Sequence, residues 1–133
     1  MCKENEMNAI KKILVALALA ATTPATFAEG KSGTAEFLME GANILINLTP
    51  SNATRKTTEE VLKLSYTSGY IRGVISATNS PDVICFPAQT SAQQIAPKII
   101  DTYNKDASTH GKSEDDLMAA TLVRHYSCPK PTK

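Results

Sequence analysis

The fold of this chain is decided by residues 57–77, which read TTEEVLKLSYTSGYIRGVISA. Thr57 and Glu60 have the spacing of a capping box, in which each side chain bonds the backbone N–H of the other residue. Apolar residues then recur at helical spacing, namely Val61, Leu62, Leu64, Tyr66, Tyr70, Ile71, Val74 and Ile75. The segment therefore predicts a long helix, which Asn79-Ser80-Pro81 ends.

Two glycines lie in the middle of this predicted helix. Gly69 and Gly73 are four residues apart, so they share one face. Each costs about 1 kcal/mol relative to alanine in a helix interior. We expect the compensation to be the close packing of another helix across that face. The alternative interpretation is that the face forms a groove for a partner.

Two further helices are predicted on either side of this segment. A helix over residues 34–48 begins at the capping residue Thr34 and ends before Pro50. Ser91 and Gln94 form a second capping box, which opens a helix through Ile95, Ile99, Ile100 and Tyr103. Pro97 either kinks this helix or marks its first turn.

The last predicted helix begins at Ser113. Three acidic residues occupy its first turn, and Arg124 and His125 lie in its last turn, where each charge suits the helix dipole. Its inward-facing positions are predicted to be Leu117, Met118, Leu122, Val123 and Tyr126. Because no segment alternates with period two over a useful length, the chain is predicted to be a compact all-α domain of four to five helices.

The N-terminus has the pattern of a cleaved export signal. Lys11 and Lys12 precede a short apolar run over residues 13–21, Pro24 follows, and Thr26-Phe27-Ala28 offers small residues at the cleavage site. The apolar run is too short to span a bilayer, which needs about 20 residues. We therefore expect a signal peptide over residues 1–28, a periplasmic domain over residues 29–133, and no membrane association after cleavage.

The charge of the expected mature domain argues against nucleic acid as a partner. The whole chain has 14 basic and 13 acidic residues, and residues 1–28 contain three Lys and two Glu, which leaves eleven of each. A balanced domain lacks the positive surface that nucleic acid or an anionic membrane requires.

Cys85 and Cys128 are the two cysteines of the expected mature domain. An even number of cysteines in an exported domain indicates a disulfide, because an oxidising compartment lets the bond persist. A bridge between them would close a loop of about 43 residues and contribute roughly 4 kcal/mol. The competing interpretation is a free Cys85 thiolate with His110 or His125 as its base.

The sequence offers little else for chemistry. His110 and His125 are separated by a whole helix and the cysteines lack C-x-x-C spacing, so no metal site is predicted. The acidic run Glu114-Asp115-Asp116 lies on consecutive helix positions, which point in different directions. No phosphate-binding loop or nucleophile elbow is present. We expect a protein that is not an enzyme and has no cofactor.

Three stretches taken together resemble the Rap/Tai family of periplasmic immunity proteins. They are Ser68-Gly69-Tyr70-Ile71-Arg72-Gly73-Val74-Ile75, then Ile84-Cys85-Phe86-Pro87 to Gln94-Ile95, and Tyr126-Ser127-Cys128-Pro129. The resemblance covers roughly residues 34–129. One departure is that family members often carry a further cysteine just before the Gly-Tyr-Ile motif, where this chain has Tyr66-Thr67-Ser68.

The resemblance implies a function by binding. Such proteins protect bacteria by occluding the active site of a peptidoglycan amidase that type VI secretion delivers, often as homodimers. The partner implied here is a cognate secreted amidase, together with a possible second copy of the chain. Because loops vary without disturbing a core, we expect the partner contacts in the polar loop over residues 104–112, from Lys105, Asp106, His110 and Lys112.

One other binding function fits the same features. A small periplasmic stress chaperone is also a disulfide-bridged helical protein of this size. That interpretation requires binding to many unfolded clients, usually with a pH-driven opening, for which only two histidines are available.

Overall fold

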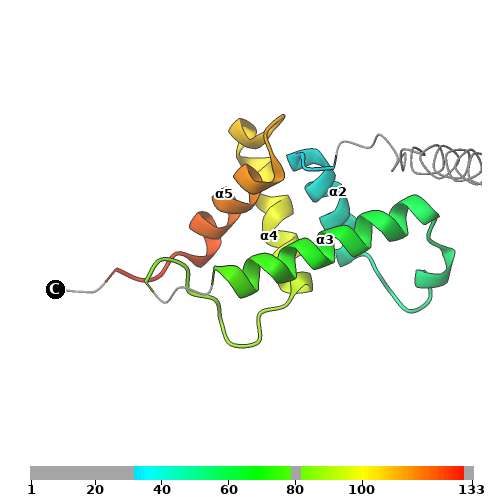
Figure 1. The fold of residues 1–133 in the computed structure, drawn as a ribbon, viewed down its shortest axis with the longest axis horizontal. Coiled ribbons are helices and arrows are strands. Elements are labelled where there is room, and N and C mark those ends of the chain that lie inside the picture. Colours follow the sequence, from blue (N-terminus) through cyan, green and yellow to red (C-terminus); the bar gives the residue numbers. More distant parts are fainter. Residues whose placement is uncertain (1–31, 79–81, 131–133) are drawn as a thin grey trace, which may run out of the picture. The chain divides into compact units, whose positions relative to one another are not determined.

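The computed structural model describes residues 32–78 and 82–130, and the expected signal peptide, residues 1–28, lies outside these ranges. The described residues form four α-helices and two short 3-10 helices. The α-helices are α2 (Ala35–Ile46), α3 (Thr58–Ala77), α4 (Ala92–Lys105) and α5 (Glu114–Tyr126), and the 3-10 helices are η1 (Ala53–Arg55) and η2 (Ala107–Thr109). The predicted all-α fold of four to five helices is confirmed (Figure 1).

Each α-helix begins directly after a hydroxyl residue that caps it. The cap side chain accepts a hydrogen bond from the backbone N–H three residues later, at Thr34, Thr57, Ser91 and Ser113. In α3, α4 and α5 the third helical residue returns the bond, which completes a capping box. The four predicted helix starts are therefore confirmed, since they depend on contacts within one turn.

Helices α2 and α4 form the centre of the packing. α2 contacts the other three α-helices, and α4 lies against α2, α3 and α5. Figure 1 shows α3 crossing α2 and α4. The large side chains that are fully buried come from all four helices and are Leu38, Ile71, Ile95, Ile99, Leu117 and Met118. The prediction that Val123 faces inward is wrong, because Val123 is 64% exposed. Leu122 is buried in the core, and consecutive residues of a helix point in different directions.

A close approach of two helices does occur, but at a glycine that the sequence analysis did not single out. A Cβ built on Gly41 in α2 would lie 1.9 Å from Oγ1 of Thr67 in α3 and 2.8 Å from its Cβ. Thr67 is fully buried at this contact. Gly41 therefore leaves the space that the Thr67 side chain occupies, which lets α2 and α3 pack closely.

The packing predicted at Gly69 and Gly73 is not observed. Both glycines are exposed, and beyond their own stretch of helix no heavy atom of the described residues lies within 4 Å of a Cβ built on either one. The buried face of α3 instead carries Thr67 and Ile71. Helical spacing places Gly69 about 200° from Thr67, so the glycines lie on the outer side of the helix. The alternative interpretation, a face for a partner, stays open.

Pro97 lies inside α4 as its sixth residue and not in its first turn. A proline here cannot donate the backbone bond that the carbonyl of Gln93 would otherwise accept. Both residues are exposed, so water can take that position. The helix start at Ala92 follows from the Ser91 capping box, which holds the preceding turn in helical geometry.

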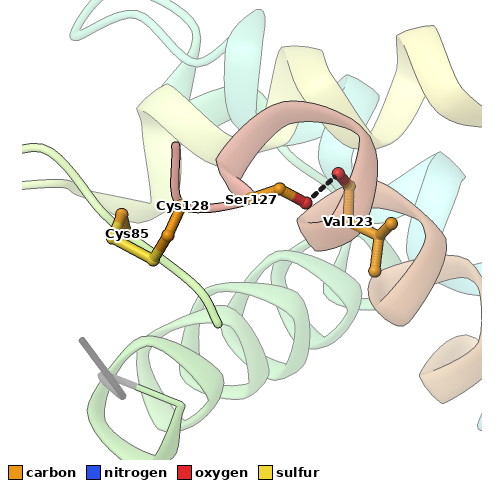
Figure 2. The surroundings of a disulfide bond; sticks show 4 residues. All are labelled: Cys85, Val123, Ser127 and Cys128. Carbon is orange, nitrogen blue, oxygen red and sulfur yellow. Dashed lines mark hydrogen bonds between the residues drawn. A yellow bond between two sulfur atoms is a disulfide. The ribbon is translucent and has the colours of Figure 1, made fainter. Parts of the chain in front are cut away.

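Cys85 and Cys128 form a disulfide, as predicted. The bond joins the link between α3 and α4 to the residues that follow α5 (Figure 2). Two backbone bonds flank it: Cys85 N–H donates to the Tyr126 carbonyl at 2.8 Å, and Cys128 N–H donates to the Val83 carbonyl at 3.1 Å. Ile84 and Ser127 thereby form an isolated antiparallel bridge, which holds the C-terminal segment in place.

Candidate functional site

The segment over residues 104–112, predicted as the contact loop, is largely a folded turn. Lys105 belongs to α4, and its Nζ lies 2.7 Å from Asp101 Oδ1. Asp106 caps η2, where its Oδ1 accepts from the N–H of Ser108 at 3.1 Å and from its hydroxyl at 2.5 Å. Two of the four predicted contact residues are therefore already engaged, Lys105 with a residue of α4 and Asp106 within the turn.

The remaining two residues follow directly. His110 stacks on Tyr103 with ring centroids 4.1 Å apart, and its Nε2 lies 2.8 Å from the Tyr103 carbonyl. The Lys112 carbonyl accepts from Ala35 N–H at 3.0 Å, and its side chain is exposed. Asp106, His110 and Lys112 thus lie together on one ordered turn, and their role in partner binding stays a prediction.

Glu36 anchors this turn to the start of α2. Its Oε1 accepts from the Gly111 N–H at 2.6 Å and from the Tyr103 hydroxyl at 3.3 Å. The Gly111 bond is the main reason why the pKa of Glu36 lies below its ordinary value. Gly111 has a φ of +70°, a conformation that glycine adopts without strain.

A groove of about 730 Å³ lies between α2, α3 and the start of α4. Its apolar lining comes from all three helices, and its polar lining is mostly hydroxyl. The full lining is Leu45, Leu48, Leu64, Ser65, Ser68, Arg72, Ile75, Ser76, Thr90, Ser91, Ala92 and Gln93. We call this feature the α2–α3–α4 groove.

This groove was not predicted from the sequence, although α3 carries a signal for it. Ser65, Ser68, Arg72 and Ser76 follow each other at spacings of three, four and four residues, which places them on one flank of the helix. Arg72 lies within the Gly-Tyr-Ile-Arg-Gly stretch that carried the family resemblance. Only the packing of α2 and α4 shows that this flank borders a hollow.

A second polar cluster joins α3 to the first turn of α5. The hydroxyl of Tyr66 donates to Glu114 Oε1 at 2.5 Å, and the hydroxyl of Tyr70 donates to Asp115 Oδ1 at 2.5 Å. The bond to Glu114, together with burial, raises the pKa of Tyr66 to about 12. Burial and the bond to Asp115 raise the pKa of Tyr70 as well. The two carboxylates are used to hold helices together.

The described residues give no support to thiol or metal chemistry. Neither sulfur of the Cys85–Cys128 disulfide can act as a nucleophile while the bond is intact. His125 Nε2 lies 3.2 Å from Asp101 Oδ2, and burial lowers the pKa of this histidine. Within residues 32–78 and 82–130, no three His, Cys, Asp or Glu side chains gather as metal ligands would.

The comparisons with known proteins decide the class of this protein. A family model described as Rap1a immunity proteins matches residues 40–128, well over half of the 133-residue chain. The chain belongs to the Rap1a immunity protein family. Searches of curated proteins and of solved structures gave no significant match.

Membership in the Rap1a family confirms the resemblance drawn from the sequence and gives the protein an immunity role. A Rap1a immunity protein binds a partner effector protein, as an inhibitor does. The matched stretch contains both cysteines and every residue of the α2–α3–α4 groove. None of the described helices combines the length and the hydrophobicity needed to cross a membrane.

Proposed function

We propose that this Rap1a immunity protein acts in the periplasm, where it binds and inhibits a peptidoglycan amidase delivered by type VI secretion. It thereby protects the cell against its own toxin and that of its siblings. The observation that carries this proposal is the family match over residues 40–128. The Cys85–Cys128 disulfide supports it as well, because such bonds persist in oxidising compartments such as the periplasm.

We also propose that the chain forms a homodimer through the outer face of α3. Leu62, Tyr66, Gly69 and Gly73 share that face at spacings of four, three and four residues. Leu62 is 54% exposed and Tyr66 is 39% exposed, and both glycines are uncovered. Small residues let a second helix approach closely, while the two larger side chains supply apolar area. Light scattering of the purified protein measures the dimer, and Gly69→Glu is expected to dissociate it.

The direct test is protection of living cells. A bacterium that makes a periplasm-directed peptidoglycan amidase of the cysteine class lyses, and co-expression of the full chain is expected to restore growth. The matched control is the chain without residues 1–28, which should fail to protect because it stays in the cytoplasm. Lysis at the same rate with and without the full chain would show that this amidase is not the target.

The same material separates inhibition from the chaperone alternative. An inhibitor forms a stoichiometric complex with the amidase and leaves the aggregation of unrelated denatured proteins unchanged. A chaperone suppresses that aggregation and forms no defined complex with the folded amidase. Suppressed aggregation without a defined complex would replace the proposed function with that of a chaperone.

A further inference from the structure

The α2–α3–α4 groove combines apolar walls with a single charge. Leu45 and Leu48 come from the C-terminal end of α2 and the residues after it, and Leu64 and Ile75 come from α3. Among the described residues, Arg72 is the one charged residue of the lining, and no Asp or Glu borders the groove. The groove therefore has a net positive charge within a mostly uncharged wall.

Arg72 has no intramolecular partner within the described residues. Its guanidinium group makes no hydrogen bond and no ion pair there, and the residue is exposed where it borders the groove. A guanidinium group presents a planar fork of donors that matches both oxygens of a carboxylate. Ala92 and Gln93, the first residues of α4, border the same groove, and the N-terminus of a helix carries a partial positive charge.

The serine hydroxyls that α3 contributes to the groove are also available. Ser65, Ser68 and Ser76 make no side-chain hydrogen bond within the described part of the chain, and neither does Gln93. Each can donate to, or accept from, the backbone of a bound segment. A small inorganic anion would use Arg72 but would leave the apolar walls uncovered, so the lining suits an extended peptide better.

We propose that the α2–α3–α4 groove is the docking site of the effector. The occupant is an extended segment of the effector with one carboxylate, which pairs with Arg72. Apolar side chains of the effector on either side of that carboxylate cover the leucines of the groove. This proposal rests on the immunity function and locates its partner on the molecule. The volume of about 730 Å³ is within the range of about 300–1,000 Å³ that binding pockets occupy.

The test measures the affinity of the full, oxidised chain for the secreted effector encoded beside its gene, whatever the enzymatic class of that effector. Arg72→Ala is expected to raise Kd by about 30-fold or more, mainly through faster dissociation, because a desolvated carboxylate loses its partner. The Kd of Arg72→Lys should lie between those of wild type and Arg72→Ala, since lysine keeps the charge but lacks the planar set of donors. Ser65→Trp, which fills the groove from an exposed position, should also abolish tight binding.

The matched control is Arg124→Ala, which removes an exposed arginine from α5, away from the groove lining. It should leave Kd unchanged, and thermal melting should show that all four variants fold. Equal affinity of wild type, Arg72→Ala and Ser65→Trp would overturn the docking site while the immunity function stands. An effector that is not an amidase would overturn the proposed function. The Kd values of wild type and Arg72→Ala would still show whether that effector docks in the groove. If Arg72→Ala and Ser65→Trp change dimer formation but leave the Kd for the effector unchanged, the groove binds a second copy of the chain and the proposal is refuted.

Discussion

Gly41→Ala is the most informative single change in this protein, because it adds one methyl group where α2 and α3 touch. The new Cβ would lie 1.9 Å from Thr67 Oγ1, 2.8 Å from Thr67 Cβ and 3.2 Å from Thr67 Cγ2. Ordinary contacts of a Cβ begin near 3.4 Å, so the methyl is about 1.5 Å too close to the hydroxyl and about 0.6 Å too close to the Cβ.

Rotation of the Thr67 side chain cannot remove the whole clash. It moves Oγ1 and Cγ2, but Cβ is fixed to the backbone, so α2 and α3 must separate by several tenths of an ångström. Thr67 is fully buried, and interiors are packed too densely for helices to separate freely. Overpacking of this kind costs typically about 1–3 kcal/mol. Alanine recovers up to about 1 kcal/mol through its helix propensity.

An approach of 1.9 Å places the cost in the upper part of that range, about 2–3 kcal/mol, so we expect a net loss of about 1–2 kcal/mol. For a domain of about 100 residues this lowers Tm by roughly 4–16 °C. Urea unfolding followed by circular dichroism measures the change. Thr67→Ala removes two of the three clashing atoms, so the double variant should lose less stability than the two single variants combined, with a coupling of about 1 kcal/mol.

Gly69→Ala and Gly73→Ala are the matched controls for this prediction. Both positions are helical and exposed, with open space where the Cβ would go. In the monomeric domain each substitution should raise the free energy of unfolding by about 0.5–1 kcal/mol, because glycine is unfavourable in a helix interior. If Gly41→Ala is as stable as wild type, or if Gly69→Ala destabilises the isolated domain, the assignment of close packing to Gly41 is refuted.

Three further predictions concern the links between elements. Replacing Cys85 and Cys128 by serine should lower the free energy of unfolding by about 4 kcal/mol. Urea unfolding of the variant, and of wild type with and without reductant, measures this loss, and equal unfolding midpoints would contradict it. Because the pKa of Glu36 lies below 4.5, its stabilisation is complete above that pH and is lost as the pH falls through the lowered pKa. Glu36→Gln should therefore be less stable than wild type at neutral pH and should show a smaller drop in Tm on acidification. Parallel curves of Tm against pH for the two proteins would disprove that Glu36 anchors the turn. Tyr66→Phe should cost about 1–3 kcal/mol in urea unfolding, since it leaves the buried Glu114 carboxylate without its donor; Tyr70→Phe should cost less, because the bond to Asp115 is exposed.

The contacts within one turn were readable from the sequence, and those between helices were not. Thr57 with Glu60 and Ser91 with Gln94 define helix starts because the bonding groups are three residues apart. The disulfide was readable because only two cysteines follow the expected signal peptide. The role of Gly41 depends on Thr67, which lies 26 positions later, and no local pattern connects the two.

The same limit explains the outcome at Gly69 and Gly73 and at the groove. A pair of glycines four apart shows that one face of α3 is smooth, but it does not show whether that face is covered. The polar loop was identified by its composition, whereas the anchoring of Gly111 by Glu36 depends on a residue 75 positions away. Arg72 reads as an ordinary surface charge until α2 and α4 are placed around it.

The close contact at Gly41 also connects stability with recognition. Leu45 lies one turn after Gly41 on α2, and Ser68 directly follows Thr67 on α3; both border the α2–α3–α4 groove. The distance between the two helices at Gly41 and Thr67 therefore sets the distance between two walls of the groove. A substitution that separates the helices would widen the groove while Arg72 stays on its flank. Gly41→Ala should then weaken effector binding even at temperatures where the variant is fully folded, an effect that Gly69→Ala should not share.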